Sequence, residues 1–78
     1  MRYSDETYDK MLDAAAAVCK EAESWLQKCN KYALAQQPKS DTWYLAIARA
    51  ALATEATILA ARTYADLQRE ANNARADG

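Results

Sequence analysis

The sequence ALAQQPKSDTWYLAI (residues 33–47) decides the fold, because it separates two long stretches that favour helix. A proline disfavours the helical conformation in the residue before it, so Pro38 predicts that the first helix ends just upstream. Ser40 or Asp41 then suits the start of the second helix, since a short oxygen-bearing side chain accepts hydrogen bonds from free amides of the first turn. A connection of about four residues between two helices of similar length predicts antiparallel neighbours. The expected fold is therefore an all-α, antiparallel two-helix hairpin.

The bounds of the two helices follow from working outward from this break. Ser4 or Asp5 suits the N-cap of the first helix. The chain is rich in alanine and has one glycine and one proline, so helix is favoured throughout and no strand is expected. A polar C-terminus is expected to fray. The 78 residues thus form a single domain, with a first helix at about 5–35, a loop at about 36–40, a second helix at about 41–72 and a tail over 73–78.

Apolar residues recur every three or four positions along the first predicted helix, which is the pattern of a coiled-coil seam. This seam consists of Tyr8, Met11, Ala15, Val18, Ala22, Trp25, Cys29 and Tyr32, and it is widened by Leu12, Cys19, Leu26 and Ala33. The second predicted helix has two apolar faces. One holds Tyr44, Ile47, Ala51, Ile58, Ala61 and Ala65, and the other holds Leu45, Ala48, Leu52, Ala56, Leu59 and Leu67. The first helix can cover only one of them, and a bare stripe of that length exceeds the apolar surface that soluble monomers usually expose. The pattern predicts a helical homo-oligomer with no stable folded monomer.

Several classes of function are disfavoured by composition. The chain has no histidine, its one glycine is the last residue, and its net charge is −1, so we expect no enzyme, no metal site, no cofactor and no DNA or RNA partner. Cys19 and Cys29 lie about 15 Å apart on one helix, too far for a disulfide within the chain. We find neither a signal peptide nor a membrane-spanning run, and we expect a cytoplasmic protein that contacts no membrane.

Binding is the remaining class of function, and four residues are candidates for it. Tyr3 and Tyr8 lie at the start of the first predicted helix, where a ring can stack on a base, although Tyr8 also fits the core. Lys20 flanks the seam and is otherwise a solvated lysine. Arg62 pairs either with Asp66 or Glu55, or with a phosphate across a subunit interface. The role of Arg49 stays open.

Blocks of both predicted helices resemble the small phage-encoded anti-CBASS sponges. The similar blocks are Val18-Cys19-Lys20-Glu21-Ala22-Glu23 with Leu26, then Ile47-Ala48-Arg49 with Leu52, then Glu55-Ala56 with Ala60 and Arg62. The resemblance implies a catalytically inert helical hairpin that assembles into a hexamer and sequesters cyclic oligonucleotides of bacterial immunity. It implies ligand-binding roles for Tyr3 or Tyr8, for Lys20 and for Arg62. The chain departs from the family in its Tyr-to-Lys spacing, in a one-residue shift of the second-helix blocks, and in Leu59, where the family has Trp.

Two functions are therefore expected. The first is a phage-type immune-evasion sponge in the host cytoplasm, which binds cyclic di- or trinucleotides without cleaving them. The alternative is a non-catalytic hairpin that acts as a structural or protein-interaction module, for example as a dimeric four-helix bundle.

Overall fold

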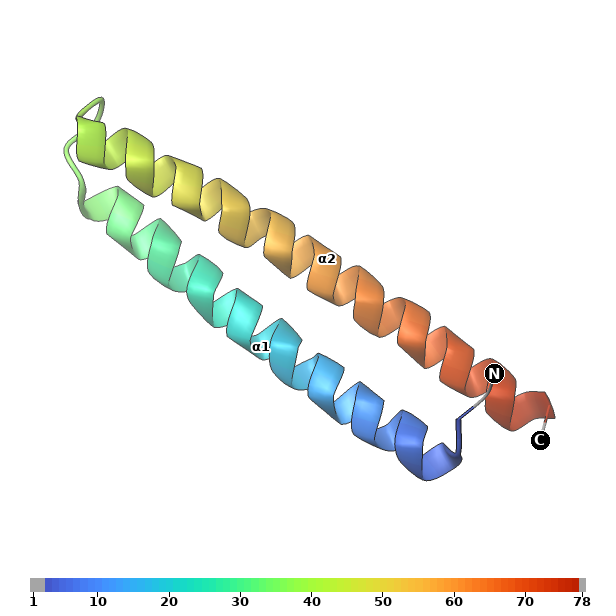
Figure 1. The fold of residues 1–78 in the computed structure, drawn as a ribbon. Coiled ribbons are helices and arrows are strands. Elements are labelled where there is room, and N and C mark those ends of the chain that lie inside the picture. The colour runs from blue at the N-terminus through green and yellow to red at the C-terminus, as the bar shows by residue number, and fades with distance from the viewer. Residues whose placement is uncertain (1–2, 78) are drawn as a thin grey trace.

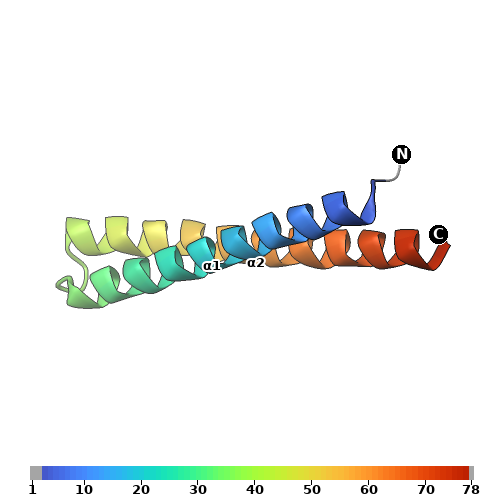
Figure 2. The ribbon, with the colours of Figure 1, turned by 90° about the horizontal axis from the view of Figure 1, so that it is seen from below.

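The chain folds into one long helical hairpin. A computed structural model describes residues 3–77 and contains two helices, α1 (Asp5–Ala35) and α2 (Asp41–Asp77), with no strand in that range. The helices run antiparallel side by side from the loop to the termini (Figure 1). They cross at a shallow angle (Figure 2), and the hairpin measures 57 × 15 × 14 Å. The predicted all-α hairpin is confirmed.

Serine side chains begin both helices. The backbone N–H of Thr7 donates to Ser4 Oγ at 3.2 Å, and the N–H of Trp43 donates to Ser40 Oγ at 3.2 Å. Ser40 Oγ also donates to the Gln37 carbonyl at 2.7 Å, which ties the second cap to the loop. Of the two cap candidates at each helix, the structure therefore uses the serine. These bonds satisfy N–H groups of the first turn, which have no carbonyl acceptor within the helix.

The loop reverses the chain through one left-handed residue. The N–H of Gln36 donates to the Ala33 carbonyl at 3.2 Å and closes α1. Lys39 then adopts a φ of 68°, a region that costs a residue with a Cβ about 1 kcal/mol or more. The turn is thus built at some local energetic cost by a residue that is not glycine.

The contact between the helices follows a regular heptad on each of them. On α1 the residues turned toward α2 are Tyr8, Leu12, Ala15, Cys19, Ala22, Leu26, Cys29 and Ala33. On α2 the residues turned toward α1 are Trp43, Ala46, Ala50, Ala53, Thr57, Ala60, Tyr64, Leu67, Ala71 and Ala74. Alternating steps of three and four residues keep such a seam facing its partner. We call these two rows the seam.

The phase of the seam differs from the sequence-based prediction. On α1, the row of Val18, Trp25 and Tyr32 faces outward, and the row predicted only to widen the stripe faces α2. On α2, ten of the twelve residues of the two predicted faces are exposed, and only Ala56 and Leu67 are half-buried. A third, alanine-rich face contacts α1 instead. Alanine lets the two backbones approach closely, and the one hydroxyl in its middle, on Thr57, is satisfied by donating to the Ala53 carbonyl at 2.8 Å.

Helix α2 continues past Asn72, where a frayed tail was predicted, to Asp77. Ala71 is fully buried in this last part, and Ala74 is half-buried. Arg75 pairs with Asp9 and lies 3.9 Å from Asp5 at the start of α1. Tertiary contacts therefore hold a segment whose own polarity suggests fraying. Gly78, the last residue of the predicted tail, lies outside the described residues.

Candidate functional site

The two candidate tyrosines lie together at the terminal end of the hairpin. The Tyr3 and Tyr8 rings meet edge to face, with centroids 5.6 Å apart. Tyr3 is 49% exposed, whereas Tyr8 is fully buried and its hydroxyl donates to Glu70 Oε1 at 3.4 Å. A fully buried ring has no free face for a base, so the hairpin supports the core role that was the alternative for Tyr8. Tyr3 keeps an accessible surface.

The two candidate cations lie elsewhere. Lys20 is exposed on α1, twelve residues and hence about 18 Å along the helix from Tyr8. Arg62 is exposed on α2 and forms no ion pair with a side chain of residues 3–76, because Asp66 pairs with Arg69 at 2.8 Å instead. A single hairpin therefore does not join the tyrosines, Lys20 and Arg62 into one site.

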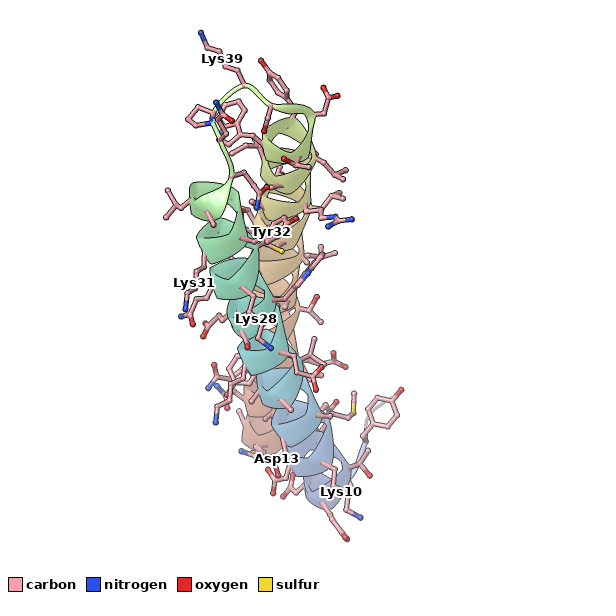
Figure 3. The ribbon with its side chains drawn as sticks, turned by 90° about the vertical axis from the view of Figure 1, so that its left-hand side faces the viewer. Lys10, Asp13, Lys28, Lys31, Tyr32 and Lys39 are labelled. Atoms are coloured by element: carbon pink, nitrogen blue, oxygen red, sulfur yellow. The ribbon has the colours of Figure 1, made fainter. Side chains whose placement is uncertain are left out.

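A different group of side chains does converge, on the half of the hairpin nearest the loop. A shallow groove of about 400 Å³ runs between the helices there. Its lining residues are Trp25, Lys28, Cys29, Tyr32, Ala46 and Arg49. Figure 3 shows Lys28 and Tyr32 on α1 beside Lys31, with Lys39 at the loop. Two aromatic rings and two cations thus border one apolar floor, an arrangement suited to a flat, anionic ligand.

The charge of the hairpin is distributed unevenly and is positive around this groove. Residues 24–50 carry four basic side chains, Lys28, Lys31, Lys39 and Arg49, against one acidic side chain, Asp41, for a net charge of +3. The whole chain nevertheless has a net charge of −1, so the terminal half is acidic. The near-zero total therefore hides a cationic end, which attracts anions over distances of about the Debye length.

No known protein family, no curated protein and no solved structure matches this chain. The resemblance to phage sponges therefore stays a prediction.

A second groove continues along the same side of the hairpin toward the termini. It has a volume of about 310 Å³ and an almost wholly apolar lining of Ala15, Val18, Ala56, Leu59, Ala60 and Thr63. Both grooves lie beside one row of large side chains on α1 and one on α2, each with seven-residue spacing. We call these rows the open face, and they consist of Val18, Trp25 and Tyr32 on α1 and Leu45, Leu52 and Leu59 on α2. All six side chains are 44 to 65% exposed.

Sequence reasoning assigned most of these residues to other roles. The sequence pattern predicts Trp25 and Tyr32 in the contact between the helices. This prediction hid the groove that they line with Lys28 and Arg49. One signal for the groove was present in the sequence. Lys28 and Arg49 are nearly equidistant from the middle of the loop, so an antiparallel hairpin brings them level with each other.

No group of three or more Cys, Asp or Glu residues within 3–77 is arranged to hold a metal ion. Helix α2 is long and apolar enough to cross a membrane by length and composition, with a mean hydropathy of 1.3 in its most apolar window. That window contains Arg49 and Glu55, and a charged residue at a bilayer centre costs about 2.5 to 3.5 kcal/mol. Membrane insertion of α2 is therefore disfavoured.

Proposed function

We propose that the hairpin is a non-catalytic module that associates with copies of itself through the open face and forms a helical bundle. The observation that carries this proposal is that six large apolar side chains, from Val18 to Leu59, are left half exposed along one side. Half of the eighteen seam residues are alanine, and Tyr8 is the one large side chain among them that is fully buried. The hairpin therefore buries little large apolar surface of its own. Burial contributes about 25 cal/mol per Å², which makes association a large part of stability.

Analytical ultracentrifugation over a range of protein concentrations tests this function. We expect a dimer or a larger assembly of the unmodified chain. Leu52→Asp places a charge in the middle of the open face and should produce the monomer or unfolded chain. Leu34→Asp is the matched control, because Leu34 is 87% exposed and lies outside the open face. An unmodified chain that sediments as a folded monomer at every concentration contradicts the proposal.

The groove at Trp25 and Arg49 favours a second candidate function, the sequestration of cyclic oligonucleotides. Stacking of a base on an aromatic ring contributes about 1 to 3 kcal/mol, and an arginine fork binds a phosphate through two hydrogen bonds. The positive charge of residues 24–50 supports an anionic ligand. Tyr3, Lys20 and Arg62, the residues implied by the resemblance, lie at three separate places, so a site made from them needs more than one copy of the chain.

Thermal unfolding with and without cyclic di- and trinucleotides tests the second candidate. A ligand at one hundred times its dissociation constant should raise stability by about 2.7 kcal/mol. Lys28→Ala together with Arg49→Ala should abolish this shift. Lys31→Ala is the control, since Lys31 is an exposed lysine of α1 that does not line the groove. No shift with any of these ligands counts against sequestration and leaves the bundle function in place.

A further inference from the structure

The open face has a two-fold pattern along its length. Val18 lines a groove with Leu59, and Lys28 lines a groove with Arg49, so residues whose numbers add to 77 lie level across the hairpin. By this rule the open face has three levels, which pair Val18 with Leu59, Trp25 with Leu52, and Tyr32 with Leu45. Successive levels are seven residues, or about 10.5 Å, apart. The level of Trp25 and Leu52 is the centre of the face.

The four charged residues nearest this centre along the open face have opposite signs on its two sides. Lys28 and Arg49 each lie three residues from the centre, toward the loop. Glu21 precedes Lys28 by one heptad and lies four residues from the centre, toward the termini. Glu55 lies three residues from Leu52 in that same direction, at the outer edge of the face, where it borders Leu59 together with Arg62. The face is therefore bordered by two cations toward the loop, and by two carboxylates and Arg62 toward the termini.

We infer that the occupant of the open face is a second copy of this chain, docked face to face and antiparallel around a two-fold axis through the level of Trp25 and Leu52. This inference rests on the proposed function and names the partner and its register. The axis lays α1 on α1 of the partner and α2 on α2 of the partner. Val18 then meets the partner's Tyr32, and Leu45 meets the partner's Leu59.

The same axis places opposite charges against each other. The axis brings Lys28 over the partner's Glu21 and brings Arg49 to the level of the partner's Glu55, so each cation of the loop side lies near a carboxylate of the partner. The other face-to-face arrangement, with both loops at one end, would lay α1 on the partner's α2. Lys28 would then face the partner's Arg49, which places like charges together. Charge complementarity thus selects the antiparallel dimer and suppresses the parallel one.

The area of the open face is sufficient for a specific dimer. Each of its six large side chains leaves on the order of 100 Å² exposed, so the dimer buries about 1,200 Å² before its small residues are counted. Stable interfaces bury about 1,200 to 2,000 Å². The result is a four-helix bundle in which the seam of each hairpin and the open face are both covered. The partner fills the grooves beside Trp25 and Val18, so this dimer and sequestration of a ligand in the groove at Trp25 exclude each other.

Charge exchange in the full chain tests the pairing. Lys28→Glu with Arg49→Glu should raise the dimer dissociation constant about tenfold or more, as measured by ultracentrifugation. Adding Glu21→Lys and Glu55→Lys exchanges the two ends of the face and should restore dimerisation. Lys20→Glu with Lys31→Glu makes the same change in net charge on exposed lysines outside the open face and should leave the dimer intact. If the quadruple variant dimerises as weakly as Lys28→Glu with Arg49→Glu, the inference is overturned.

Cross-linking tests the register independently of charge. In a background of Cys19→Ala and Cys29→Ala, Trp25→Cys should form an intermolecular disulfide on oxidation, because residue 25 meets its own copy at the axis. Leu52→Cys should also form this disulfide, and it replaces Trp25→Cys in the test if that variant associates poorly. Tyr32→Cys should not cross-link to itself, because the axis places it against Val18 of the partner. If the protein is a dimer in which residue 32 cross-links to its own copy and residues 25 and 52 do not, this register is overturned. The bundle function then still stands. A folded monomer overturns both.

Discussion

Replacing Ala53 by leucine tests whether the alanine-rich face of α2 is the one that packs on α1. Ala53 is fully buried in the seam, while Ala51, two residues earlier on the same helix, is exposed and outside the open face. A leucine adds three carbon atoms at either position. At Ala51 these atoms stay in solvent, and such surface changes usually alter stability by less than about 0.5 kcal/mol.

At Ala53 the same three carbons would have to enter a closed contact. Burying them would contribute about 0.8 kcal/mol per carbon if there were room. The seam has no room at a residue that is 0% exposed, so α1 must move away, and overpacking of this kind costs about 1 to 3 kcal/mol. For a domain of this size, that corresponds to a melting temperature roughly 4 to 24 °C lower.

Urea unfolding followed by far-UV circular dichroism measures the difference between Ala53→Leu and Ala51→Leu. Both variants must be compared at one protein concentration, because association shifts apparent stability. Equal stability of the two variants, or a larger loss for Ala51→Leu, would refute the assignment of the seam. It would instead favour one of the two faces that were predicted from the sequence.

Substitutions at three further residues test the ends of the hairpin, each by thermal or urea unfolding. Tyr8→Ala should cost about 3 to 5 kcal/mol because the ring is fully buried, whereas Tyr8→Phe should cost less than about 1.5 kcal/mol because it removes one long hydrogen bond; equal losses would contradict the packing role. Lys39→Gly should stabilise by about 0.5 to 1 kcal/mol, since glycine adopts a φ of 68° without strain, and a loss of stability would show a different turn. Ser40→Ala should cost about 0.5 to 2 kcal/mol through loss of the α2 cap, and an unchanged stability would show that the cap is dispensable.

The parts of the fold that local chemistry determines were predictable from the sequence. Pro38 and Ser40 determine where α1 ends and α2 begins, because both act through the backbone of their immediate neighbours. The extension of α2 to Asp77 was not predictable in this way. It depends on pairing of Arg75 with Asp9, which lies at the opposite end of the chain.

The phase of the seam was not predictable from periodicity. Helix α2 has apolar or small residues on three faces, and a pattern within one helix cannot rank faces that are completed only by a partner. The prediction considered only the two faces that contain large side chains, such as Leu45 and Ile47, and expected α1 to cover one of them. The structure packs the row containing Ala46 and Ala53, since small residues allow close approach of two helices. The same error hid the groove, because Trp25 was assigned to the core.

The levels of the hairpin have a consequence for how its length can change. Each face repeats every seven residues, and the two helices stay level because their positions mirror each other about the loop near Pro38. Deleting seven residues from α1 and the seven level residues from α2 would therefore shorten the hairpin by about 10.5 Å and leave every face in phase. Deleting three or four residues from one helix alone would rotate one face away from its partner. Viable insertions and deletions in the helices of this protein should accordingly come as matched pairs of heptads.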